Sequence, residues 1–141
     1  MAGKTKRTEA PPSAPLILDS GAIIALSRGD QRARAFVDRA LELGAELFVP
    51  SVAVAETVRG DGPRDASVNR VLAAVDSVLA AAEPVARTAG RLLGRTRSSE
   101  TIDALVVAGV IEIGGGRILT SDPDDIRLLA RGAVGISTHR V

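Results

Sequence analysis

The chain has 141 residues, and 45% of them are hydrophobic, which is enough for one folded domain with a buried core. It contains no cysteine and a single histidine, His139, to which we assign no role. Disulfides and thiolate metal sites are therefore excluded, and imidazole-rich zinc sites are disfavoured. Any bound metal would be held by oxygen atoms, which suits Mg²⁺ or Mn²⁺.

The formal net charge is +1, but all except two of the 18 basic residues are arginine, which makes bidentate contacts to phosphate. Two Phe, no Trp and no Tyr leave few rings on which bases could stack, so we expect any RNA contact at the backbone. The longest apolar stretch, residues 104–111, is too short to span a membrane, and no segment resembles a signal peptide. We therefore expect a cytoplasmic protein without membrane contact.

The predicted elements alternate between short apolar runs, typical of buried strands, and segments with apolar residues at helical spacing. In chain order they are strand 16–18, helix 22–27, helix 34–43, strand 47–49, helix 51–58, helix 67–78, strand 83–85, helix 86–96, helix 101–111, strand 118–120, helix 124–130 and strand 134–136. Ser51 is expected to cap the helix that it begins. Residues 1–15 are predicted to be a flexible tail and residues 16–141 the folded domain. The alternation predicts an α/β fold with a central, mostly parallel sheet and helices on both faces.

Acidic residues lie just beyond the predicted strands. Asp19 and Asp122 each follow a strand, and Glu56 lies in the helix after another. Ligands of an open parallel sheet bind outside the carboxyl ends of its strands, so these acids can converge there. Helix capping competes as an explanation for Asp19 and Asp122. It does not explain Glu56, which lies beyond the first turn of its helix. Small or apolar neighbours are expected to place Glu56 close to the buried face, and a solvated helix face is the competing explanation.

Asp103 lies in the first turn of the most apolar helix, between Ile102 and Ala104. The helix dipole stabilises an acid in that position, which is the structural explanation. A carboxylate among apolar residues needs a partner or a metal ion, however, and this favours a functional role. Asp124 and Asp125 are weaker candidates, because they also fit as acids that stabilise a helix N-terminus.

Clustered carboxylates suit the hydrolysis of a phosphodiester. The reaction requires neutralised phosphate charge, an activated water and a stabilised leaving oxygen, and two divalent ions about 4 Å apart can supply all three. Without metal the carboxylates repel one another, so the empty cluster is expected to be unstable or partly protonated.

Three arginines form a stripe on the predicted helix 86–96, at positions Arg87, Arg91 and Arg95. Residues 86–99 contain no acid, so we expect no local ion pair to neutralise the stripe. It is either a solvated helix face or a contact for the RNA backbone.

Four motifs follow one another along the chain: Leu-Ile-Leu-Asp19-Ser20-Gly-Ala, Val-Ala-Glu56-Thr, Thr-Ile-Asp103-Ala and Leu-Thr120-Ser121-Asp122-Pro-Asp124-Asp125-Ile. Together they resemble the ordered motifs of PIN-domain ribonucleases, in particular the VapC-type toxins of type II toxin–antitoxin systems. The resemblance covers the chain from Leu16 to its C-terminus.

The resemblance implies a PIN-like sheet and a metal-dependent endoribonuclease that cleaves RNA. The catalytic and metal-binding residues that it implies are Asp19, Glu56, Asp103 and Asp122. Asp124 or Asp125 would be a supplementary acid, and we assign the metal contact to Asp125. The hydroxyls of Ser20 and Thr120 would lie nearby. Mg²⁺ or Mn²⁺ is the implied cofactor, and a homodimer and a small VapB-type antitoxin are the implied assemblies.

Two other functions compete with this interpretation. A phosphotransfer or phosphatase domain also gathers acids at strand ends, but a receiver domain would need a lysine near a late strand, and no lysine follows Lys6. A catalytically silent PIN-like module that binds a protein partner is the second alternative. All four acids are present, which disfavours it, and metal titration would separate the two.

Overall fold

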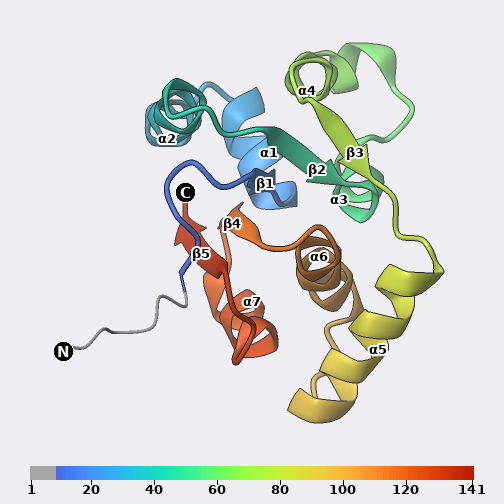
Figure 1. Ribbon diagram of the computed structural model, residues 1–141. Helices are drawn as coiled ribbons and strands as arrows, with labels where there is room; N and C mark the ends of the chain where they lie inside the picture. Colours follow the sequence, from blue (N-terminus) through green and yellow to red (C-terminus); the bar gives the residue numbers. More distant parts are fainter. Residues whose placement is uncertain (1–8) are drawn as a thin grey trace, which may run out of the picture.

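Short apolar runs of the sequence form a parallel sheet at the centre of the computed structural model, which describes residues 9–141 (Figure 1). The strands are β1 (Leu16–Leu18), β2 (Leu47–Pro50), β3 (Ser77–Leu79), β4 (Gly116–Thr120) and β5 (Ile136–Arg140). They lie in the order β3-β2-β1-β4-β5, and every neighbouring pair is parallel. The carboxyl ends of all five strands therefore lie at the same edge of the sheet.

Helices cover both faces of this sheet. Those in the described part are α1 (Ser20–Ser27), α2 (Gln31–Glu42), α3 (Ser51–Thr57), α4 (Gly62–Ala73), α5 (Glu83–Thr96), α6 (Thr101–Glu112) and α7 (Pro123–Ala130). Helices α1, α2 and α4 lie on one side and α5, α6 and α7 on the other (Figure 1). The predicted α/β fold, with a central parallel sheet and helices on both faces, is confirmed.

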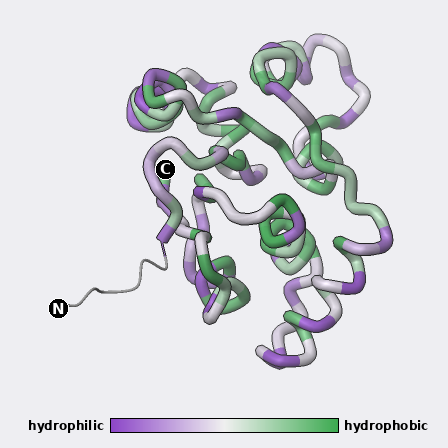
Figure 2. Tube along the Cα trace, in the orientation of Figure 1, coloured by the Kyte–Doolittle hydropathy of each residue, from purple (hydrophilic) through white to green (hydrophobic). Residues whose placement is uncertain are grey.

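The alternation of side chains along β1 explains the two layers of the core. Leu16 and Leu18 pack into the cluster beneath α1 and α2, whereas Ile17 packs into the cluster of α6 and α7, and all three are fully buried. Hydrophobic residues concentrate along the central strands and α6, while α5 carries many hydrophilic ones (Figure 2). Among the described residues, no helix is both long and apolar enough to cross a bilayer.

The region between β2 and α5 differs from the prediction. The predicted helix 67–78 corresponds to α4, which begins at Gly62, because the Asp61 side chain caps it and Pro63 follows in the first turn. It ends at Ala73, so the predicted residues 74–78 are wrong, and the last two of them belong to a strand. The predicted strand 83–85 is wrong: Glu83 and Pro84 open α5. The strand in this region is β3, whose Val78 is 48% exposed, so burial does not reveal it in the sequence.

Other element ends also differ from the predicted ones, two of them for a clear reason. Ser51 is the first residue of α3 rather than its cap, and its hydroxyl accepts a hydrogen bond of 3.1 Å from the N–H of Ala81. The last strand starts at Ile136 rather than at Val134, which is 75% exposed and precedes a turn at Gly135 with φ of 80°.

Residues 9–15 pack against the sheet before β1 begins. The Arg117 guanidinium donates to the carbonyl of Pro12 (3.1 Å), and the Arg117 N–H donates to the carbonyl of Pro15 (2.8 Å). Ala10 is buried. The packed part of the chain thus begins before Leu16, while residues 1–8 of the predicted tail lie outside the described residues.

Candidate metal centre

Asp19 ends β1 and begins α1, and its carboxylate is held in a fixed orientation. Oδ1 accepts from the N–H of Ser20 (2.8 Å), and Oδ2 accepts from the hydroxyl of Thr120 (3.0 Å), the last residue of β4. The residue is only 5% exposed. A buried carboxylate with both oxygens hydrogen-bonded keeps its position with or without a ligand.

Asp122 is connected to the same hydroxyl. Its backbone N–H donates to Oγ1 of Thr120 (3.2 Å), so Thr120 links the ends of β1 and β4. Asp122 precedes α7, but its exposed side chain accepts no capping hydrogen bond from the described residues. Helix capping, the competing explanation for this residue, therefore does not account for its carboxylate.

The loop between β4 and α7 also packs closely against α1. Gly21 approaches it so closely that a Cβ there would lie 2.8 Å from the backbone nitrogen of Ser121 and closer still to its side chain. The Arg140 guanidinium donates to the carbonyl of Ser121 from the other side (3.1 Å). Asp122, the next residue, is positioned by these contacts.

A third group of acids comes from α6 and α7. Carboxylate oxygens of Glu100, Asp103 and Asp125 all lie within 4.8 Å of one another. Asp103 and Asp125 are half-buried, and Glu100 is exposed. Asp124, by contrast, is exposed and lies 3.9 Å from the Arg127 guanidinium. Of the two neighbouring acids, it is Asp125 that faces Asp103.

Glu100 is absent from the set predicted from the sequence. It precedes α6 and lies three residues before Asp103, a spacing that brings side chains to the same side of a helix. That spacing was the available signal in the sequence. Its approach to Asp125 depends on how α6 packs against α7, which the sequence pattern does not show.

The acids form one negatively charged region. Burial and then the charges of Asp19, Asp125, Glu100 and Glu56, in decreasing order, raise the pKa of Asp103 to about 7. Burial also raises the pKa of Asp19; its two hydrogen bonds oppose that effect, and the charge of Asp122 adds to it. Glu56 is the outermost member, exposed near the end of α3.

This donor set fits a hard divalent cation. It consists of carboxylate oxygens, several of them partly buried, and their mutual repulsion is the kind that a bound cation relieves. The one histidine has other partners: His139 packs against Phe36, with ring centres 5.1 Å apart, and shares a hydrogen bond with the hydroxyl of Ser137.

The arginine stripe on α5 makes contacts that the sequence did not predict. Arg87 forms an ion pair with Glu83 (2.7 Å), so the expectation that no local ion pair neutralises the stripe is wrong for this residue. Arg91 donates to the hydroxyl of Thr88, and Arg95 donates to the carbonyl of Arg131 (3.0 Å). Contact of this stripe with RNA stays a prediction.

Known structures share this architecture at low sequence identity. The chain is similar to VapBC2 of Rickettsia felis, solved with a promoter DNA fragment (TM-score 0.70, 10% identity, 87% of this chain and 97% of that chain covered). It is similar to FitAcB of Neisseria gonorrhoeae (TM-score 0.66, 16% identity, 88% and 96% covered). A third similar structure is VapBC-5 of Mycobacterium tuberculosis, from the VapBC family of toxin–antitoxin systems (TM-score 0.59, 21% identity, 92% and 100% covered).

Comparison of the sequence with family profiles identifies the family. No curated protein matches the chain. The profile of the PIN domain, however, matches residues 16–132, a range that contains Asp19, Glu56, Asp103 and Asp122. With that match over most of its length, the chain belongs to the PIN domain family.

Proposed function

We propose that the protein is a metal-dependent endoribonuclease and the toxin of a VapBC-type toxin–antitoxin module. The observation that carries the proposal is the convergence of Glu100, Asp103 and Asp125, with the pKa of Asp103 raised to about 7. Such mutual repulsion destabilises the protein unless a cation compensates for it, and a perturbed carboxylate cluster of this kind is typical of a functional site.

In this proposal the metal-holding residues are Asp19, Glu56, Asp103, Asp122 and Asp125, and Glu100 is added to the predicted set. Bound Mg²⁺ or Mn²⁺ would supply an activated water and neutralise charge on the scissile phosphate. Thr120 keeps the Asp19 carboxylate oriented by donating to Oδ2. A bound cation would favour the charged form of the Asp103 carboxyl. Asp122 is positioned through its own N–H.

Cleavage of a mixed tRNA and rRNA pool with Mn²⁺ or Mg²⁺ tests the proposal. We expect cutting by the wild type that EDTA abolishes and that both Asp19→Asn and Asp103→Asn abolish. Asp124→Asn is the matched control, since Asp124 belongs to the same acidic run but lies beside Arg127. Cutting that survives both substitutions would show that the site is misplaced.

A second readout does not depend on choosing the right RNA. A ligand that binds the folded state raises the melting temperature, so Mn²⁺ should stabilise the wild type and stabilise Asp103→Asn much less. A wild type that neither cuts RNA nor responds to Mn²⁺ would favour the alternative, a PIN-like module that binds a protein without catalysis.

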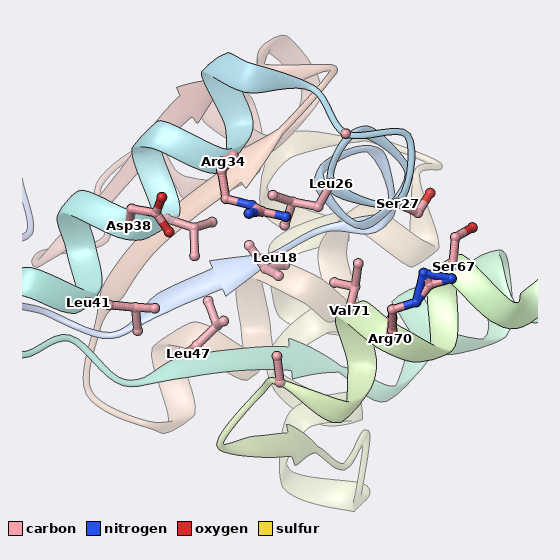
Figure 3. Close-up of a pocket in the computed structure, with 13 residues that line it drawn as sticks. Leu18, Leu26, Ser27, Arg34, Asp38, Leu41, Leu47, Ser67, Arg70 and Val71 are labelled. Atoms are coloured by element: carbon pink, nitrogen blue, oxygen red, sulfur yellow. The ribbon is translucent and has the colours of Figure 1, made fainter.

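The antitoxin part of the proposal rests on an apolar groove between α1, α2 and α4 (Figure 3). It has a volume of about 460 Å³, and Leu18, Leu47 and Val71 contribute to its apolar lining. Arg34 on α2 and Arg70 on α4 flank it, and neither forms an ion pair with another described residue. An apolar segment with acidic residues beside it would fit this surface.

The solved relatives are toxin–antitoxin proteins, and we infer that a small VapB-type antitoxin occupies the groove. Arg34→Glu should then weaken inhibition by the antitoxin while RNA cleavage persists. Arg39→Glu is the control, because Arg39 lies on the same helix, outside the groove, beside Glu42. Equal inhibition of the wild type and the Arg34→Glu variant would place the antitoxin elsewhere.

A further inference from the structure

A second cavity, of about 270 Å³, adjoins the carboxylate cluster. It lies between the ends of α1 and α3 and the start of α4, and Glu56 forms part of its wall. Its basic residues are Arg28, Arg59 and Arg64. The outermost acid of the candidate metal centre and three arginines thus line one pocket.

Asp65 fixes the segment 59–64, which runs from the turn after α3 into the first turn of α4 and carries two of these arginines. This carboxylate, only 3% exposed, accepts hydrogen bonds from three consecutive backbone N–H groups, those of Arg59, Gly60 and Asp61, at 2.8–3.2 Å. Gly60 has a φ of 80°, which the tight turn requires and other residues rarely adopt. Asp61 in turn accepts from the N–H of Arg64 (3.3 Å). The backbone of Arg59 and Arg64 is therefore fixed beside Glu56.

The three arginines of this pocket form no ion pair with a described residue, although the charge of Arg64 acts on Asp65, which also lines the pocket. Within residues 9–141, none of the three arginines lies within 4.0 Å of a carboxylate oxygen. Nη1 of Arg59 donates to the carbonyls of Ala55 and Val58 (3.1 Å each), which orients the group at the end of α3, while Nε and Nη2 donate to no described residue. Arg87 on α5, by contrast, is already paired with Glu83.

We propose that this pocket binds a backbone phosphate of the RNA, next to the phosphate that is cut. The inference rests on the proposed function. A region with six acids repels a polyanion, so the substrate has to be held by cations close to the cluster, and arginine suits phosphate through its paired donors. Because Glu56 belongs both to the cluster and to the pocket wall, a strand whose scissile phosphate lies at the acids can extend towards the arginines.

Binding and cleavage together test the assignment. Binding of a fluorescent single-stranded RNA is followed in EDTA, where the wild type does not cut, over a range of salt concentrations. The triple variant Arg28→Gln/Arg59→Gln/Arg64→Gln should reduce the slope of log K against log salt by about 0.7, the value for one phosphate contact on a single strand. Each single variant, Arg28→Gln, Arg59→Gln or Arg64→Gln, should reduce it by part of that amount. In Mn²⁺ each should raise KM by up to about tenfold and leave kcat unchanged.

Two further variants control for charge and for folding. Arg131→Gln removes an exposed arginine at the far end of α7 and should leave the slope and KM as in the wild type. Arg59→Lys keeps the charge and should therefore show the salt slope of the wild type, unlike Arg59→Gln. If the glutamine variant lost its slope only because it unfolds, this restoration would not be expected.

The possible failures are distinguishable. A wild type that binds and cuts RNA while the three glutamine variants keep its slope and KM would overturn the pocket and leave the proposed function intact. If Arg87→Gln and Arg91→Gln reduced the salt slope and the pocket variants did not, the RNA would contact α5 instead. That result would also overturn the pocket. A wild type that neither binds nor cuts RNA would overturn both proposals.

Discussion

The hydroxyl of Thr120 donates a 3.0 Å hydrogen bond to Oδ2 of Asp19 and joins the ends of two neighbouring parallel strands, β4 and β1. The hydroxyl oxygen of Thr120 also accepts a hydrogen bond from the N–H of Asp122. One buried side chain thus links the carboxylate of Asp19 to the backbone of Asp122, two of the predicted metal ligands. Threonine suits this position because its methyl group packs in the core while its hydroxyl both donates and accepts.

Replacing Thr120 with valine keeps the shape of the side chain and removes the hydroxyl. Oδ2 of Asp19 would lose its partner in a buried environment, a loss of about 1–3 kcal/mol. We expect weaker Mn²⁺ binding and slower cleavage, measured by calorimetric titration and by single-turnover kinetics. Thr120→Ser, which restores the hydroxyl, should behave like the wild type. Equal Mn²⁺ affinity in the valine and serine variants would contradict the linking role.

The raised pKa of Asp103 predicts how the metal-free protein responds to pH. The unfolded chain loses this proton near the ordinary value of 3.8, whereas the folded protein keeps it up to about 7. The contribution of this carboxyl to stability is therefore complete below pH 3.8, decreases as the pH rises, and is lost above about 7. In EDTA, Asp103→Asn should then melt at a higher temperature than the wild type at pH 8, with a smaller difference at pH 4.

The control for that comparison is Asp124→Asn, which removes an exposed charge beside Arg127 and should show no gain in EDTA. In Mn²⁺ the order should reverse, because only the wild type can use all of its ligands. An Asp103→Asn variant that is less stable than the wild type in EDTA at pH 8 would mean that the carboxylate is not repelled by its neighbours.

Gly21 tests whether the β4–α7 loop positions the site. An alanine here would place its Cβ 2.8 Å from the Ser121 backbone nitrogen, so the loop that carries Asp122 would have to move. We expect Gly21→Ala to lose most of its cleavage activity and of its Mn²⁺-induced rise in melting temperature. Gly94→Ala on α5 is the control: nothing lies within 4 Å of its added Cβ, and the helix should gain about 0.5–1 kcal/mol. Full activity in Gly21→Ala would show that the loop tolerates displacement.

The central strands could be predicted because they are buried on both sides. In β1 every residue is fully buried, which appears in the sequence as an unbroken apolar run. The edge strand β3 has no such signature: it depends on pairing with β2 and on Asp76, whose carboxylate accepts from the N–H of Leu47, far away in the sequence. A pattern read over neighbouring residues does not contain that contact.

The same distinction applies to the candidate site. Asp19 and Asp122 could be proposed because topology alone brings strand ends to one edge. The proximity of Glu100 to Asp125 depends instead on the packing of α6 against α7, and the position of Glu56 beside three arginines depends on the loop held by Asp65. These are tertiary contacts between segments with no common motif.

Asp65 links the stability of the protein at low pH to its proposed RNA pocket. Burial alone would raise the pKa of this carboxyl, but three backbone N–H groups and the charge of Arg64 outweigh it, and the pKa is lowered below 3.8. Its stabilising contribution is therefore present above pH 3.8 and is lost as the pH falls below that value. Asp65→Asn should lower the melting temperature at pH 7 and reduce its fall between pH 4 and pH 2.5. This carboxylate positions Arg59 directly and Arg64 through Asp61, so the variant should also raise KM for RNA more than it lowers kcat. A defect confined to folding would instead lower the active fraction and leave KM unchanged.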